Sequence, residues 1–222
     1  MMFARVSVLG FALLLLCPPV SAAPSPQETH QRTASRRVFD GIGGGPPKGA
    51  WTVGVQGGYP WQTVRGLVGV GKRMAPIAEL ETALFRRWRP SLGLSMAWVD
   101  VPRFRLSGEV LLGWLIQTGA VKRLGPQGIL RMRFSAPLGR IAPYLVLGTR
   151  HALLLDRRTV VSSSASVTTL EARHNWTGWA TLGAAFAIND MLGLDVGMDW
   201  PWVDAPTISI PGFHLGIWIG GG

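Results

Sequence analysis

The chain has 222 residues, a net charge of +10 and a single cysteine, Cys17. Cys17 lies in an N-terminal segment that we expect to be removed. The mature chain then has no cysteine, which excludes disulfides and thiolate chemistry. No later stretch approaches the roughly 20 uninterrupted apolar residues of a membrane-spanning helix.

The N-terminal segment has the layout of a secretory signal. Arg5 precedes an apolar run that ends at Leu16, and small residues close the segment at Ala22. This order predicts that residues 1–22 are a cleaved signal peptide and that the mature protein is exported. A lipoprotein site at Cys17 is an alternative, which is less favoured because the residue before it is not small.

Residues 23–49 are polar, rich in Pro, Gly, Ser and Thr, and end in "GIGGGPPKG". Such a composition cannot bury enough apolar surface to form a core. We therefore expect a flexible periplasmic arm, followed by one domain over residues 50–222.

From residue 50 onward, strand-like runs follow one another without a helical period. Many have a length near the roughly 9 to 11 residues of a tilted transmembrane strand, whereas strands of soluble sheets most often have roughly 5 to 6. Dividing the long fifth and eighth runs differently would give eight or twelve strands. The ten predicted runs are 50–58, 64–72, 76–85, 91–100, 103–117, 128–135, 142–150, 175–188, 191–200 and 211–220.

The links between these runs alternate in length. The longest links, 118–126, 155–174 and 201–210, all follow odd-numbered runs. Bacterial barrels have short periplasmic turns and longer external loops, and an even number of strands places both termini in the periplasm. We therefore expect these links to be external.

Each run has one apolar face and one face of small or charged residues. In "MLGLDVGMDW" (191–200), the leucines alternate with Asp195 and Asp199. The apolar face carries no ionisable residue, which favours contact with lipid because one Arg or Lys there costs about 2 to 4 kcal/mol near the midplane. A secreted soluble sandwich with the leucines inside is the alternative.

Large aromatic residues on the apolar face lie close to strand ends, as expected for interfacial girdles. Trp218 falls on the opposite face, which suggests a bulge or a wrong register. The predicted girdle residues are Trp51, Trp98, Trp114, Phe134, Trp176, Phe186, Trp200 and Phe213.

The inward face collects charges of both signs. Because buried charges need partners, we predict a salt-bridge network that fills a narrow lumen. A narrow selective path, a polar ligand on the arginines, or acid/base carboxylate pairs are the alternatives. The predicted network comprises Arg65, Glu79, Glu81, Arg103, Arg105, Glu109, Arg131, Arg133, Arg150, Asp195 and Asp199.

The link 155–174 contains serines, with carboxylates and two histidines within it or beside it. A hydrolytic triad there is defined by geometry, which the sequence does not give. The histidines lack metal-ligand spacing, so we expect no catalytic set, metal or cofactor. The residues considered are His151, Asp156, Ser162, Ser163, Ser164, Ser166, Glu171 and His174.

The same link has a β-prone centre between charged ends, so it can extend the flanking strands as a hairpin. Loops on a rigid scaffold commonly bind partners. Arg157, Arg158, Arg173 and His174 then form a candidate external contact surface for anionic glycolipid or surface polysaccharide. The basic excess of an exported chain points to such partners rather than to nucleic acid, unless it only reflects a biased composition.

With its alternating faces, aromatic ends and phrases such as "APYLVLG" (142–148), the chain resembles small bacterial outer-membrane β-barrel proteins. The last run has a polar-x-Gly spacing at His214 and Gly216 that is similar to the assembly signal of that class. The resemblance implies outer-membrane lipid and the barrel-assembly machinery as partners.

The sequence therefore predicts an all-β, closed antiparallel transmembrane barrel of about ten strands in the bacterial outer membrane. We expect a structural or surface-interaction role and a narrow lumen filled with charges. A narrow solute or ion pore and a lipid-modifying barrel enzyme are the alternative functions.

Overall fold

The computed structural model describes residues 45–71, 73–83, 86–101, 103–118, 122–161, 166–203 and 211–221. The predicted signal peptide and most of the predicted arm lie outside these residues. In the described part of the chain, no helix is long and apolar enough to cross a membrane.

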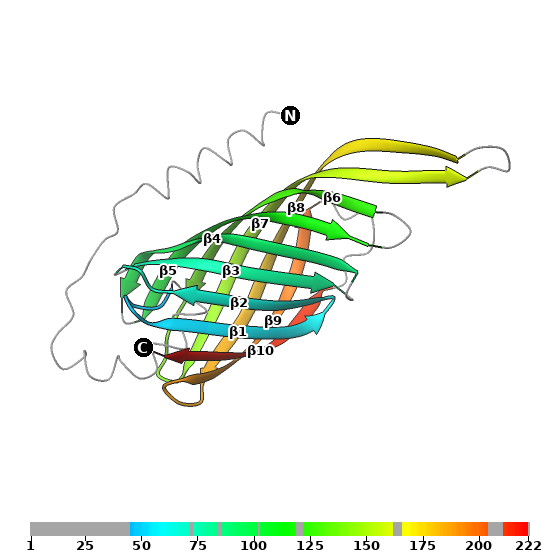
Figure 1. The fold of residues 1–222 in the computed structure, drawn as a ribbon. Coiled ribbons are helices and arrows are strands. Elements are labelled where there is room, and N and C mark those ends of the chain that lie inside the picture. Colours follow the sequence, from blue (N-terminus) through cyan, green and yellow to red (C-terminus); the bar gives the residue numbers. More distant parts are fainter. Residues whose placement is uncertain are drawn as a thin grey trace.

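Ten antiparallel strands close into one barrel (Figure 1). Each strand pairs with its neighbours in sequence, and the first strand pairs with the last, so no edge is left free within the ring. This confirms the predicted fold class with ten strands rather than eight or twelve. The strands are β1 (Trp51–Tyr59), β2 (Trp61–Val68), β3 (Met74–Ala83), β4 (Arg87–Val101), β5 (Phe104–Gln117), β6 (Lys122–Ser135), β7 (Ile141–Val161), β8 (Ser166–Ala187), β9 (Leu192–Val203) and β10 (Gly212–Gly221).

Strands β4 and β6 begin at Arg87 and Lys122, earlier than the predicted starts at residues 91 and 128. Pro90 pairs with Leu80 of β3, and Pro126 pairs with Trp114 of β5, so the register continues through both. Proline cannot donate a hydrogen bond to the ladder, which is why a sequence pattern ends a strand there. In this barrel the neighbouring residues keep the strands together.

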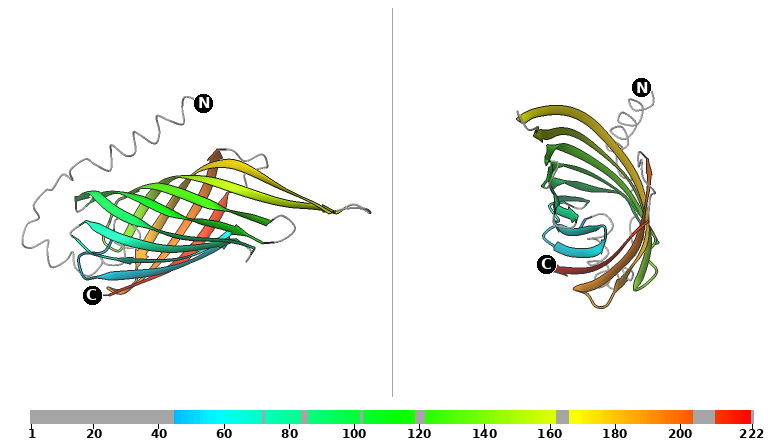
Figure 2. Two further views of the ribbon diagram at one scale, coloured as in Figure 1. Left: turned by 45° about the horizontal axis from the view of Figure 1, so that its top comes forward. Right: turned by 90° about the vertical axis from the view of Figure 1, so that its right-hand side faces the viewer.

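Strands β7 and β8 are the longest, with 21 and 22 residues. Their pairing runs without interruption from Ile141 and Phe186 to Val161 and Ser166. The outer part projects from the barrel as a two-stranded ribbon, shown in yellow in Figures 1 and 2. Most of the predicted link 155–174 is therefore strand, as the hairpin interpretation predicted.

The alternation of faces is the one expected for lipid outside and charge inside. Asp195 on β9 is 1% exposed, whereas the next residue, Val196, is 44% exposed. On β5, Glu109 is buried inside, whereas Leu112 is exposed on the outer face. The inverted, soluble-sandwich assignment of the faces is therefore wrong for the described strands.

An apolar layer fills the lumen near the end where β1 begins and β10 ends. Trp218 pairs with Gly54 and Gly193, and it is almost completely buried. A Cβ on Gly54 would lie 2.5 Å from the Trp218 ring, so this glycine leaves the space that the indole occupies. The described partners of Trp218 in this layer include Leu67, Ile77, Leu111, Ile129, Ala142, Ala185 and Ala187.

The β10 strand pairs regularly around Trp218, so the predicted bulge or wrong register there is wrong. Register shifts occur instead between Ala97 and Val99 of β4 and between Gly178 and Trp179 of β8. The first shift places Trp98 in a buried position over Gly108, away from the exposed aromatic positions.

The chain already contacts the barrel before the predicted domain boundary. Pro46 is fully buried, and a Cβ on Gly45 would lie 2.6 Å from the Ala75 side chain. The Gly49 amide donates a hydrogen bond of 2.9 Å to the Gly69 carbonyl. The last residues of the predicted arm therefore cover the apolar end of the lumen.

Candidate functional site

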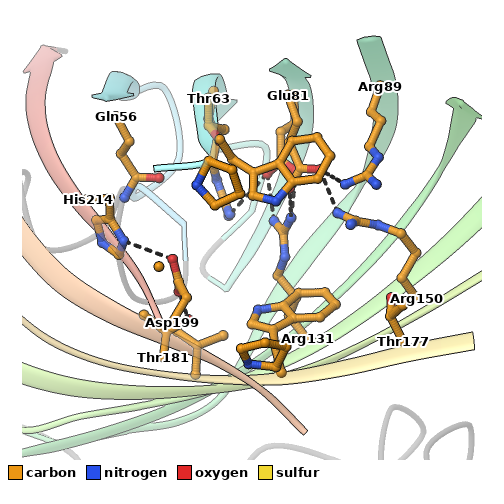
Figure 3. A pocket seen from close by; sticks show the side chains of 18 of the residues that line it. Gln56, Thr63, Glu81, Arg89, Arg131, Arg150, Thr177, Thr181, Asp199 and His214 are labelled. Atoms are coloured by element: carbon orange, nitrogen blue, oxygen red, sulfur yellow. Dashed lines mark hydrogen bonds and ion pairs between the residues drawn. The ribbon is translucent and has the colours of Figure 1, made fainter. Parts of the chain in front are cut away.

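A cavity of about 410 Å³ occupies the half of the lumen near the β1–β2 turn (Figure 3). Tyr59, Pro60 and Trp61 of that turn line the cavity, and the turn lies at the end of the barrel from which the ribbon projects. Pockets for small molecules have volumes of about 300 to 1,000 Å³. The cavity therefore has the size of a small-ligand site.

One wall of the cavity is an arginine–glutamate cluster, formed by Arg65, Glu79, Glu81, Arg89, Glu109, Arg131 and Arg150. Arg131 donates two hydrogen bonds of 2.6 Å to Glu79. Arg65 donates to both carboxylate oxygens of Glu109, at 3.0 and 2.5 Å. Such bidentate pairs are the strongest form of the Arg–carboxylate interaction.

Glu81 joins the outer members of this cluster. Its carboxylate lies 2.5 Å from Arg150, 3.3 Å from Arg89 and 3.4 Å from Arg131. Figure 3 shows these arginines converging on Glu81 from several strands. The cluster thus ties β2–β7 together across the lumen, which satisfies charges that would be costly to bury alone.

The opposite wall is a histidine–aspartate cluster, formed by Gln56, Tyr144, Thr181, Asp195, Asp199 and His214. The Tyr144 hydroxyl donates to Asp195 at 2.6 Å and lies 3.0 Å from Nε2 of His214. The other ring nitrogen of His214 lies 3.3 Å from Asp199. Thr181 donates to the other oxygen of Asp199, and Gln56 donates to Asp195.

Glycines make room for these side chains. Gly183 and Gly197 lie under the Tyr144 hydroxyl, where added Cβ atoms would approach it to 2.4 and 3.0 Å. Gly197 is also 2.6 Å, measured from its added Cβ, from the His214 ring. The alternation of small and large residues on β8–β10 therefore shapes this wall, as expected for a narrow barrel interior.

Aromatic rings lie against the arginines of the cavity. The Arg89 guanidinium is 3.7 Å from the centre of the Trp61 ring. Arg150 and Arg131 are 5.3 and 5.9 Å from the centre of the Trp179 ring. These cation–π contacts hold the arginine side chains in fixed positions toward the cavity.

Arg133 differs from the other buried arginines of the cavity because no carboxylate pairs with it in the described chain. It is 9% exposed, and its buried Nε and Nη1 atoms make no hydrogen bond. In the described part of the chain, no carboxylate lies within the 4.0 Å of an ion pair with it. Its guanidinium is 5.8 Å from the centre of the Tyr144 ring.

Most of the predicted lumen residues gather at this cavity, either in its lining or in its ion pairs. Arg103 does not, because it is exposed in the turn between β4 and β5. Arg105 is buried but pairs with Asp100 at 3.0 Å near the same turn. The residues that do gather are Arg65, Glu79, Glu81, Glu109, Arg131, Arg133, Arg150, Asp195 and Asp199.

Several site residues were absent from the predicted network. Arg89 falls in the predicted link between runs 76–85 and 91–100, although it shares the inward face with Ser91. Tyr144 and His214 were on the predicted inward face, but a search for opposite charges passes over a neutral phenol and imidazole. Alternation alone could have found all three.

Both carboxylates considered for a triad are in ion pairs. Asp156 is buried and pairs with Arg123 at 3.0 Å, whereas Glu171 pairs with exposed Arg173 at 2.7 Å. Ser162, Ser163 and Ser164 lie outside the described residues. Among the described residues, no three His, Cys, Asp or Glu side chains are arranged to hold a metal ion together.

The predicted contact residues lie along the ribbon. Arg157 and Arg158 belong to β7, where they pair with Leu170 and Thr169. His174 lies at the base of the ribbon, with its ring centre 5.7 Å from that of His151.

Comparisons with known proteins found a likeness only among solved structures. No protein-family model and no curated protein sequence matches this chain. The N-terminal β-barrel domain of Pseudomonas aeruginosa OprF is 10% identical with a TM-score of 0.36, and the match covers 78% of this chain and 96% of that one. Ail, the attachment invasion locus protein of Yersinia pestis, is 12% identical with a TM-score of 0.39, over 78% of this chain and 99% of that one.

A second Ail structure, in complex with the heparin analogue sucrose octasulfate, is 11% identical with a TM-score of 0.38, over 78% and 99% of the two chains. The chain therefore has a structural resemblance to small outer-membrane β-barrels, at values that identify neither a family nor a ligand.

Proposed function

We propose that this protein is a bacterial outer-membrane β-barrel with a structural and surface-interaction role and a lumen that does not conduct. The observation that carries the proposal is the sorting of side chains on every strand. Large apolar side chains are exposed around the outside, whereas the carboxylates and guanidiniums of the arginine–glutamate cluster are buried inside. An apolar outer surface of this extent is stable in lipid and costly in water.

The lumen supports a closed barrel rather than a pore. The arginine–glutamate cluster crosses it, and the apolar layer around Trp218 fills the end near the termini. Barrels of about 8 strands have interiors that side chains fill, whereas those of 16 to 18 strands leave a channel. A ten-stranded barrel with these contents is nearer to the filled kind.

The orientation follows from the connections and the termini. Trp51, the first residue of β1, pairs with Gly221, the last residue of β10, at the end that carries the apolar layer. We place this end in the periplasm, so the cavity and the β7–β8 ribbon face outward from the cell. Export by the predicted signal peptide and insertion by the barrel-assembly machinery belong to the same proposal.

The proposal is tested by gel mobility and by conductance. Boiled and unboiled samples of the detergent-extracted membrane fraction are compared; we expect the unboiled barrel to migrate differently, because it stays closed in the gel. Planar bilayers containing the purified protein are expected to stay silent. A soluble protein without a mobility shift would overturn the barrel assignment, and ohmic steps that change in Arg131→Gln would overturn the closed lumen.

A further inference from the structure

We infer that the lumen cavity is a binding site for a small anionic sugar, with the acid group on Arg133 and hydroxyl groups on the histidine–aspartate cluster. This inference rests on the proposed function, because it needs the cavity to open outward from the membrane. It adds a ligand class and named binding residues to that role.

Arg133 has buried N–H groups that make no hydrogen bond. A guanidinium always carries its charge in proteins and offers five N–H donors. At Arg133, Nε and Nη1 are buried and donate to nothing, while the side chain lines the cavity. Burying an unpaired charge is costly. An anion in the cavity beside the Arg133 side chain would lower that cost.

The neighbouring arginines differ from Arg133 because they pair with carboxylates. Arg65, Arg131 and Arg150 each have a carboxylate at 2.6 Å or less from at least one guanidinium nitrogen. These arginines share three glutamates with Arg89, so the cluster has no spare carboxylate, and Arg133 is a buried cavity guanidinium without a carboxylate within 4.0 Å in the described chain. A carboxylate or phosphate matches the planar fork of Arg better than a halide does, because it can accept two hydrogen bonds.

The opposite wall, formed by the histidine–aspartate cluster, favours hydroxyl groups of a ligand. His214 lies 3.5 Å from Asp195 and 3.3 Å from Asp199, and no described lysine or arginine lies within 4.0 Å of either carboxylate. The Asp199 side chain is 39% exposed, so a carboxylate oxygen with spare acceptor capacity is accessible from solvent beside the cavity. Hydroxyl donors suit this oxygen, whereas a second acid group would be repelled.

The cavity volume of about 410 Å³ lies at the lower end of small-molecule sites, which suits one sugar ring rather than a long chain. A sugar acid carries both features that the walls require, one anionic group and several hydroxyls. It arises free in solution or as the terminal unit of a surface polysaccharide or glycolipid.

Titration calorimetry on the full mature barrel in detergent tests the inference. The probes are glucuronate, methyl glucuronide, glucose 6-phosphate and neutral glucose. We expect saturable one-to-one binding of glucuronate and at least tenfold weaker binding of glucose. Methyl glucuronide carries the glycosidic bond of a chain-linked sugar. Binding as strong as that of glucuronate would show that the site accepts the terminal unit of a polysaccharide or glycolipid, whereas no binding of methyl glucuronide would restrict the site to the free sugar acid. Stronger binding of glucose 6-phosphate would identify the acid group as phosphate.

The variant Arg133→Met is expected to weaken glucuronate binding at least tenfold while keeping the heat-dependent gel shift. Asp199→Asn gives a second, independent loss of affinity if Arg133→Met does not fold. Arg103→Met, in the exposed turn away from the cavity, is the matched control and is expected to bind as wild type.

Unchanged binding in Arg133→Met, or no saturable binding of any anion, would overturn the inference. A gel shift without binding rejects this inference alone, whereas a missing shift in wild type rejects the proposed function.

Discussion

Arg131 on β6 donates two hydrogen bonds of 2.6 Å to Glu79 on β3, although two strands separate β6 from β3 in the wall. The pair therefore crosses the lumen rather than following the sheet. Both side chains are almost completely buried. Their contact shows that closure of the barrel, and not local strand pairing, brings opposite charges together.

Replacing Arg131 by Met is expected to lower the free energy of unfolding by about 3 to 5 kcal/mol, because buried Glu79 loses both of its short hydrogen bonds and keeps only Arg65, at 3.6 Å. The double variant Arg131→Met/Glu79→Leu should regain most of that loss, since it removes both charges. Urea unfolding of the barrel in detergent, followed by tryptophan fluorescence, measures both changes.

The matched control for this prediction is Arg173→Met. Arg173 also pairs with a carboxylate, that of Glu171, but both side chains are at least half exposed. Its loss is expected to cost less than about 1 kcal/mol, as for surface ion pairs. Equal effects of Arg131→Met and Arg173→Met would contradict a structural role for the lumen cluster.

The contact between Trp218 and Gly54 gives a second prediction. Gly54→Ala would place a Cβ 2.5 Å from the indole, and overpacking of this kind costs about 1 to 3 kcal/mol. The double variant with Trp218→Leu should cost less than the sum of the two single changes, because the smaller side chain leaves room for the methyl group.

Gly57→Ala on the same strand is the control, since no atom lies within 4 Å of its added Cβ. Thermal unfolding of the four variants and wild type provides the comparison. Simple additivity of Gly54→Ala and Trp218→Leu would mean that Trp218 does not lie over Gly54.

The strand faces were predictable because alternation is local. Asp195 and Trp218 lie inside, as simple parity requires, and Val196 lies outside. The turn before β5 was predictable only in part, because the shift at Ala97 and Val99 changes the register of β4 and the turn holds Arg103 outside the lumen.

The pairings across the lumen were not predictable from the sequence. Arg65 reaches Glu109, and Tyr144 reaches His214, only because the stagger of a closed ring brings distant strands to the same height. The unpaired state of Arg133 follows from the same geometry. A list of inward charges suggests near neutrality, but it cannot show which charge is left without a partner.

A third prediction tests the outer surface. Leu182 on β8 is 57% exposed in the part of the wall that we place in lipid, and Leu170 in the ribbon is 72% exposed. Leu182→Arg is expected to lower stability by about 2 to 4 kcal/mol if the site lies near the midplane of the bilayer. Leu170→Arg is the matched control and should change stability little, because water surrounds it in the proposed orientation.

Both variants are refolded into lipid vesicles, and their urea midpoints are compared with that of wild type. The contrast in cost, rather than either value alone, identifies the lipid-facing band. If Leu182→Arg and Leu170→Arg are tolerated equally, the outer face of β8 does not meet lipid.

A fourth prediction concerns the ribbon. Arg157 is the last β7 residue to pair with β6, through Lys122, and beyond it the described ribbon residues pair only with each other. Replacing residues 157–170 by Asn-Gly joins Asp156 to its ladder partner Glu171 through a two-residue turn of the kind favoured in hairpins. We expect this barrel to keep its heat-dependent gel shift and its urea midpoint, because the residues of both lumen clusters lie on strand segments that the deletion leaves in place. Attachment of intact cells to immobilised anionic polysaccharide should fall if the ribbon provides the surface contact. A barrel that no longer assembles after this deletion would instead make the ribbon part of the structural core.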